Sequence, residues 1–211
     1  MAVVETATVR PLLVRRGRRL AWLTIGWNTV EGLVAVGSGA IAGSIALLGF
    51  GVDSFVEVFA GAVIIWRLSK ERHGERVSEA AEQRAIRLIA ATFLLLAAGI
   101  AFESTRKLVG AEHPDVSIVG IGVTSLSLVV MPLLARAKRR VGRAMGSRAV
   151  QADATETILC VWLSAIVLTG LVLNAVLGWW WADPIAAFGI VYIAGREGIE
   201  HWRADELEEC C

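Results

Sequence analysis

Two pairs of residues able to bind metal ions stand in apolar stretches of the sequence, each with a spacing of four. Asp53 and Glu57 form one pair, and Glu156 and Cys160 form the other. Residues four apart lie on one face of a helix, one turn from each other. A carboxylate at the centre of a membrane helix costs about 2.5–3.5 kcal/mol on insertion scales, which favours a place inside a helix bundle and a functional role. Two carboxylates this close repel, so such a pair either takes up a proton or binds a cation.

The composition indicates which elements must hold these pairs. Of the 211 residues, 55% are hydrophobic and 19% are charged, and the mean hydropathy is +0.61, whereas an average soluble domain has about 25% charged residues. With a net charge of only +1, binding to nucleic acid would need a concentrated basic face, and aromatic stacking platforms are missing, which argues against nucleic acid as a partner. We therefore predict an all-α integral membrane protein that spans the lipid bilayer several times.

Six apolar segments are long enough to cross a membrane. A bilayer core of about 30 Å needs about 20 helical residues, or somewhat fewer where long flanking side chains reach the interface. The expected spans are 20–36, 45–66, 85–102, 116–135, 149–176 and 179–194. We expect three parts: a basic amino-terminal tail at 1–19, a transmembrane domain at 20–202, and a short acidic tail at 203–211 that contains two cysteines.

Lysine and arginine are concentrated on one side of the predicted membrane, and short loops rich in these residues stay in the cytoplasm. They gather in the first 19 residues, at 67–76 after the second span and at 136–148 after the fourth, whereas the other side has only Arg106 and Lys107. Both termini are therefore predicted to be cytoplasmic. The simplest interpretation of 136–148 is a topology determinant that faces anionic lipid.

The predicted orientation places the two pairs at overlapping depths. Counted from the cytoplasmic helix ends at about 1.5 Å per residue, antiparallel packing of the second and fifth spans brings Asp53 level with Cys160 and Glu57 level with Glu156. Four O and S donors around one point suit a tetrahedral transition metal such as zinc. The alternatives are carboxyl groups hydrogen-bonded across a helix interface and a cysteine that acts as a small apolar residue.

Motifs in three spans resemble those of a known membrane protein family. The second span opens with GSIALL at 43–48 and continues with DSFVE at 53–57, the fifth carries DATETILC at 153–160, and the sixth opens with WADP at 181–184. These stretches resemble GSxALLADAxHSxxD, DAxHSxxDxxxS and WxDP of the cation diffusion facilitator family. The resemblance implies a six-helix bundle with cytoplasmic termini, and two copies of the chain in a homodimer.

The resemblance also implies a metal-binding role for each residue of the two pairs. Asp53 and Glu57 take the places of the two ligands in the second helix, and Glu156 and Cys160 those in the fifth. The family commonly has His or Asp first and Asp second in each pair, whereas this chain offers three carboxylates and one thiol. A thiolate favours Zn²⁺ and Cd²⁺, while carboxylates also accommodate Co²⁺, Mn²⁺ or Fe²⁺. We expect a minimal form without the family's usual cytoplasmic metal-binding domain.

The ligand chemistry and the resemblance together predict a function. Ligands must lose their protons to bind a metal, so alternating exposure of such a site exchanges protons for metal without a cofactor. Neither GxxxxGK[ST] nor HExxH occurs, which argues against an ATPase or a metalloprotease. We predict a secondary transporter, not an enzyme, that exports a divalent transition metal, zinc favoured, by proton antiport across a bacterial plasma membrane. The alternatives are metal uptake and a non-transporting regulator or subunit with a vestigial or sensory metal site.

Three more acidic residues lie near or within the spans. Glu31, with Asn28 one turn before it, either relays protons or hydrogen-bonds between helices. Asp153 either attracts cations at the entrance or is solvated, and Asp183 is expected to cap the sixth helix.

Two features outside the spans also have two interpretations each. His73 is either a solvated loop residue or part of a second, weaker metal site. Cys210 and Cys211, in the acidic tail, either capture metal or belong to a disordered end.

Overall fold

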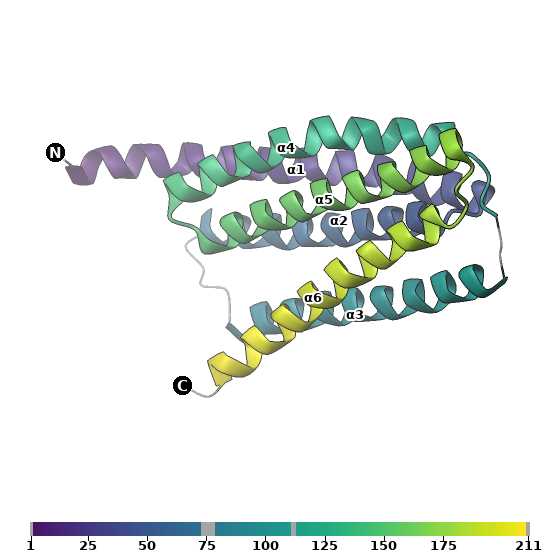
Figure 1. Cartoon of the computed structure of the whole chain (residues 1–211). Helices are drawn as coiled ribbons and strands as arrows, with labels where there is room; N and C mark the ends of the chain where they lie inside the picture. Colours follow the sequence, from purple (N-terminus) through teal and green to yellow (C-terminus); the bar gives the residue numbers. More distant parts are fainter. Residues whose placement is uncertain (1, 73–78, 111–112, 210–211) are drawn as a thin grey trace.

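The computed structural model describes residues 2–72, 79–110 and 113–209, so His73, Cys210 and Cys211 lie outside it. The described residues form six helices and no strand (Figure 1). The helices are α1 (Ala2–Ala42), α2 (Ile45–Arg72), α3 (Glu79–Gly110), α4 (Ile118–Met145), α5 (Arg148–Leu177) and α6 (Ala182–Glu209). The predicted all-α class with six helices is confirmed.

Every helix extends beyond the span predicted for it at one end or both. α1 already begins at Ala2, and α4 continues through its basic segment to Met145, because backbone hydrogen bonding does not stop where the side chains become charged. Three helices carry stretches long and apolar enough to cross a membrane by themselves: Ile45–Trp66, Ile118–Met145 and Asp153–Leu177. The sixth helix begins at Ala182 and not at 179, since α5 ends in a left-handed Gly178 and the next residues form the turn.

The six helices form a four-helix bundle with a helix pair on its side. The most extensive contacts join α1 to α2, α4 to α5 and α3 to α6. α1 also packs against α4 and α2 against α5, which closes the bundle, while α6 packs against both α2 and α5. The start of α1 and the end of α6 lie at one end of the molecule (Figure 1). We name this end, predicted to be cytoplasmic, the inner end, and the opposite end the outer end.

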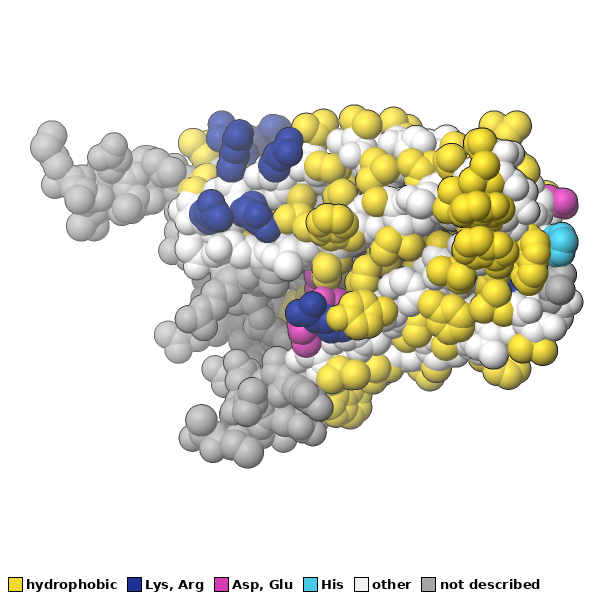
Figure 2. Space-filling model, in the orientation of Figure 1, with side chains coloured by type: hydrophobic (Ala, Val, Ile, Leu, Met, Phe, Trp, Pro, Cys, Tyr) yellow, Lys and Arg dark blue, Asp and Glu magenta, His cyan; other side chains and the backbone are white. Residues whose placement is uncertain are grey.

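The surface is largely apolar. Large hydrophobic side chains such as Leu33, Ile118 and Trp162 are exposed, as expected for helices that face lipid. Figure 2 shows Lys and Arg side chains gathered toward the inner end, where Arg139 and Arg143 of α4 are exposed. A surface of this kind fits a membrane bundle with one positively charged end.

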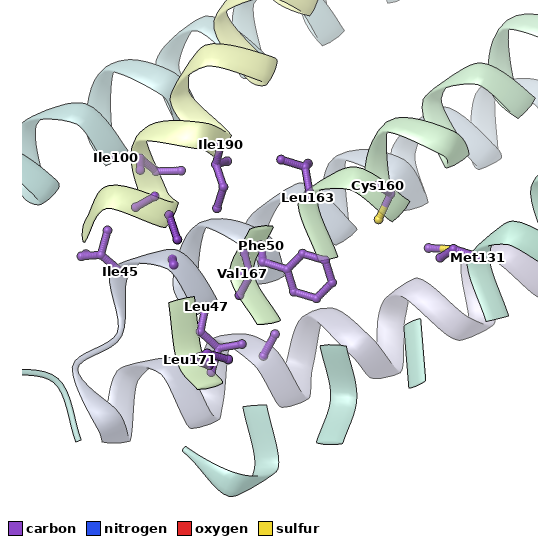
Figure 3. Packing of buried hydrophobic residues seen from close by; sticks show 14 residues of the cluster. Ile45, Leu47, Phe50, Ile100, Met131, Cys160, Leu163, Val167, Leu171 and Ile190 are labelled. Atoms are coloured by element: carbon purple, nitrogen blue, oxygen red, sulfur yellow. The ribbon is translucent and has the colours of Figure 1, made fainter. Parts of the chain in front are cut away.

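A buried apolar cluster fills the outer half of the bundle. Phe50 of α2 packs with Val167 and Leu171 of α5 and with Ile190 of α6 (Figure 3). These residues lie nearer the outer end than Asp53, because α2 and α6 begin at that end and α5 finishes there. The cluster therefore lies between the predicted donor pairs and the outer end of these three helices.

Hydrogen bonds from other helices hold the turn between α1 and α2 at the outer end. Asp183, at the start of α6 and 1% exposed, accepts hydrogen bonds from the Ser44 hydroxyl and from the backbone N–H of Ile45 at 2.9 Å. Lys107 of α3 donates to the carbonyl oxygen of Gly43, whose φ of 65° is left-handed. The expectation that Asp183 caps its own helix is therefore wrong. Its carboxylate lies at the N-terminus of α2, where unpaired N–H groups and the helix dipole attract negative charge.

Candidate metal centre

One pocket between α2, α5 and α6 collects all four predicted donors. Because α2 and α5 pack antiparallel, both pairs line the same pocket, which is partly open to the surface. Its lining consists of Asp53, Val56, Glu57 and Ala60 from α2, Glu156, Leu159, Cys160 and Leu163 from α5, and Ile193, Ala194 and Glu197 from α6. The helices thus bring together two pairs that are about a hundred residues apart in the sequence.

The pocket is rich in buried carboxyl groups. Asp53 and Glu57 are each 6% exposed and Cys160 is 2% exposed, while Glu156 is partly exposed. The carboxyl groups of Glu57, Glu31 and Glu156 all act electrostatically on Asp53. Several negative charges inside an apolar bundle attract a cation, because a cation offsets both their mutual repulsion and their loss of hydration.

Glu57 is held at one of its two oxygens. The hydroxyl of Thr157, on α5, donates to Glu57 Oε1 at 2.8 Å. Within the described residues Glu57 Oε2 has no hydrogen-bond partner. The bond places Glu57 level with Thr157, whereas the sequence predicts Glu57 level with Glu156, the preceding residue of α5. One oxygen is therefore fixed to α5, and the other is available to a ligand.

The donors line one pocket but do not converge on a point. Across the three described stretches, no group of three or more His, Cys, Asp or Glu side chains is placed so that it could hold a metal ion. Binding of one ion by three or four of these side chains therefore requires a change in their conformations.

Glu197 of α6 also lines the pocket and was missed in the sequence. The predicted span ended at 194, because the charged residues that follow lower the hydropathy, but α6 continues to Glu209. The signal was helical spacing: Ile193 and Ala194 precede Glu197 by four and three residues, and all three line the pocket. A fourth acidic side chain, and a fifth possible metal ligand beside the four predicted ones, therefore lines the pocket.

The structure corrects the interpretation of Lys138 and of Asp153. Lys138 is 1% exposed inside α4, and its Nζ atom donates to Asp153 Oδ1 at 3.0 Å and to Thr157 Oγ1 at 2.9 Å. Lys138 therefore does not face lipid, and Asp153 is buried and not solvated. The helical spacing indicates this burial, because Lys138 follows Met131 and Ala135 on the buried face of α4. The count of positive charges at 136–148 does not distinguish Lys138 from the exposed arginines around it.

Glu31 is fully buried in α1 and makes a contact between helices. Ser54 of α2 donates to Glu31 Oε2 at 3.4 Å, while Oε1 has no hydrogen-bond partner among the described residues. Asn28 donates within its own helix to the carbonyl oxygen of Thr24 at 3.0 Å. Of the two interpretations for Glu31, the structure shows the hydrogen bond between helices, from Ser54 of α2 to Glu31 of α1.

Of three similar proteins, two are described as a transporter and as a cation-efflux pump. The chain is 28% identical over 185 residues to the uncharacterized transporter sll1263 of Synechocystis sp., which covers 85% of this chain and 59% of the relative. It is 27% identical over 169 residues to the cation-efflux pump FieF of Shewanella oneidensis, covering 75% of this chain and 55% of the relative. It is 28% identical over 167 residues to the magnetosome protein MamB of Paramagnetospirillum magneticum, covering 77% of this chain and 56% of the relative.

The chain spans a little more than half the length of these curated relatives. Residues 21–203 match the family model described as the cation efflux transmembrane domain. This match reaches all six helices, leaving out residues 2–20 of α1 and 204–209 of α6, and it includes the whole pocket. The chain therefore belongs to the cation efflux family, the cation diffusion facilitators that its helix motifs resemble.

Proposed function

We propose that this protein is a secondary transporter that exports a divalent transition-metal ion from the cytoplasm in exchange for protons, with zinc as the favoured substrate. The observation that carries the proposal is the single pocket lined by Asp53, Glu57, Glu156 and Cys160 inside a membrane bundle. Membership of the cation efflux family supports transport of a metal cation.

The donor set supports both the metal and the proton exchange. Three carboxylates and one thiol combine hard and soft donors, which suits zinc and also admits cadmium, cobalt, manganese or iron. These groups bind a metal when deprotonated, so metal entry releases protons and protonation releases metal. The Oε2 atom of Glu57, which has no hydrogen-bond partner among the described residues, provides one oxygen ligand for the ion.

The arrangement around the pocket supports loading from the inner end. The apolar cluster around Phe50 lies on the outer side of the pocket, while Glu197 lies beyond Ala194 toward the inner end. A divalent ion that leaves a cell with a negative interior moves against about 2.3 kcal/mol per charge for each 100 mV. Entry of protons in exchange supplies the driving force.

The proposal extends to location and assembly. Similar proteins in bacteria favour a bacterial plasma membrane, and the family resemblance favours a homodimer. Light scattering of the purified protein in detergent measures the number of chains per particle. A mass of one chain at all protein concentrations would contradict the homodimer.

Metal-driven proton movement in proteoliposomes tests the function directly. Purified protein is reconstituted with a pH-sensitive dye inside the vesicles, and Zn²⁺, Cd²⁺, Co²⁺, Mn²⁺ and Fe²⁺ are added in turn. We expect a pH change with at least one ion that is lost in Asp53→Ala and retained in Glu103→Ala. Glu103 is a matched control because it is a carboxylate outside the pocket, paired with Arg106 near the outer end of α3.

Two results would contradict the proposal. Silence with every ion, from folded and inserted protein, would favour the non-transporting regulator. A metal flux that follows only the opposite gradient would favour uptake.

A further inference from the structure

A buried ion pair lies beside the pocket, between α4 and α5. Lys138 of α4 and Asp153 of α5 are joined by an Nζ–Oδ1 contact of 3.0 Å, with Thr157 as a second partner of Nζ at 2.9 Å. We name these three residues the Lys138 cluster; all three are buried. A lysine inside a membrane bundle is expensive unless it is paired, and such residues tend to be functional. The proposed transport leaves this lysine without a role.

The Lys138 cluster leads to the candidate site through one hydroxyl group. A threonine hydroxyl has one proton to donate and two lone pairs to accept with. Lys138 can only donate, so it occupies a lone pair of Thr157 Oγ1 and leaves the hydroxyl proton for another acceptor. The acceptors in reach are Glu57 Oε1 at 2.8 Å and the carbonyl oxygen of Asp153 at 3.0 Å. A carboxylate is the stronger acceptor when it is ionised.

The hydrogen bonds therefore run in one direction, from Lys138 through Thr157 to Glu57. The ammonium group draws electron density from the hydroxyl and makes it a better donor, because hydrogen bonds in a chain polarise one another. At the end of the chain Glu57 Oε1 is engaged, whereas Oε2 has no partner among the described residues. The two oxygens of Glu57 therefore differ in hydrogen bonding, and the residues that cause this difference, Lys138 and Thr157, do not line the pocket.

We propose that Thr157, oriented by Lys138, is a specificity-determining positioning residue that makes Glu57 bind the substrate ion through one oxygen only. The inference rests on the proposed function and deepens it. Zinc takes four ligands in a tetrahedron, each through one atom. Ions such as Mn²⁺ favour octahedral oxygen coordination, and carboxylates that bind through both oxygens help to fill such larger shells. The hydrogen bond from Thr157 to Glu57 Oε1 therefore disfavours binding of the ion through both oxygens, and with it the octahedral coordination of Mn²⁺, and so selects for zinc.

Removal of one hydroxyl group tests the proposal. Thr157→Val keeps the size and β-branching of the side chain and removes the donor to Glu57. Thr157→Ser retains the donor. Thr155→Val is the matched control, because Thr155 lies on the same helix, is exposed, and bonds only within α5, to the carbonyl oxygen of Gln151 at 3.2 Å. Thr157→Ala removes the same hydroxyl without its branched shape, should the valine variant fail to fold.

Binding and transport are both measured on each full-length variant. Zn²⁺ and Mn²⁺ dissociation constants come from competition with a metal dye in detergent, and flux comes from proteoliposomes. We expect Thr157→Val to lower the preference for Zn²⁺ over Mn²⁺ by about tenfold, equivalent to about 1.4 kcal/mol. The ratio is expected to return in Thr157→Ser and to be unchanged in Thr155→Val. If Thr157 has a purely structural role, Thr157→Val would weaken the binding of Zn²⁺ and Mn²⁺ equally and leave the ratio of the two dissociation constants unchanged.

The two measurements separate failure of this inference from failure of the proposed function. An unchanged Zn²⁺/Mn²⁺ ratio in folded Thr157→Val or Thr157→Ala would overturn the inference, whether or not the wild type transports. A wild type that binds zinc without flux would overturn the proposed transport, and the binding ratio would still decide the inference. A wild type that binds neither ion would overturn both.

Discussion

Helix α5 carries two polar pairs with the same four-residue spacing that face different neighbours. Asp153 and Thr157 face Lys138 of α4, which neutralises the carboxylate and bonds to the hydroxyl. Glu156 and Cys160 face the pocket shared with α2 and α6, where further carboxyl groups gather. The spacing of polar residues on a helix therefore does not separate a structural pair from a ligand pair. The charge of the facing helix makes the distinction, positive in one case and negative in the other.

The contrast predicts that changes on the two faces of α5 affect different properties. On the α4 side, charge is already balanced inside the protein, so removal of one of the two charges alters mainly the stability of the fold. On the pocket side, charge is balanced only when a cation or a proton enters, so a change there alters mainly binding. Thr157 belongs to the first face and bonds to a residue of the second.

The largest effect on stability is expected from Lys138→Met. Removal of one partner of a buried ion pair leaves Asp153 uncompensated, which typically costs about 3–5 kcal/mol. Thermal unfolding in detergent measures the loss. In Lys138→Met/Asp153→Leu both charges are gone, and most of the lost stability should return, because apolar replacement of a whole buried pair is often neutral. A double variant as unstable as the single one would show that charge balance does not explain this face.

A smaller effect, on binding alone, is expected from Cys160→Ser on the pocket side. The change keeps the size of the side chain and replaces a soft donor by a hard one, so zinc affinity should fall by at least about tenfold, the lower end of what even outer partners of metal ligands contribute. Manganese affinity should change less, because Mn²⁺ prefers oxygen donors. Dye competition with both ions measures the two affinities. Equal zinc affinity in wild type and variant would remove Cys160 from the ligand set.

The smallest effect is expected from Ser44→Ala, far from both faces of α5. Ser44 lies at the start of α2, accepts a hydrogen bond from the N–H of Leu47 at 3.1 Å and donates to Asp183. Loss of such a cap costs about 1 kcal/mol, seen as a modest fall in Tm. The Zn²⁺/Mn²⁺ ratio should stay constant, which sets the background for the other variants. A shifted ratio would mean that the metal site responds to any loss of stability.

Local patterns were sufficient to predict the helices and the polar face of each donor pair, whereas the meeting of the two faces also needed the orientation predicted from the distribution of Lys and Arg. Apolar stretches indicated six helices, and the spacing of Asp53 and Glu57 indicated one polar face, because both depend on neighbours in the same helix. Lys138, Asp183 and Glu197 were misjudged because their roles depend on other helices. A charged residue near the end of an apolar stretch is usually exposed, and only the position of a distant partner shows when it is not.

The hydrogen bonds at the outer turn have a mechanical consequence. Asp183 fastens the start of α6 to the start of α2, and the same helix lines the pocket farther along, at Glu197. At about 1.5 Å per residue, the separation of fourteen positions between Asp183 and Glu197 corresponds to about 21 Å along α6. A tilt of α6 by about 10° about the outer turn moves Glu197 by about 4 Å, which is more than the length of a hydrogen bond, about 3 Å. Because these hydrogen bonds hold the start of α6 against α2, a small rotation of α6 about this point changes the width of the pocket at Glu197.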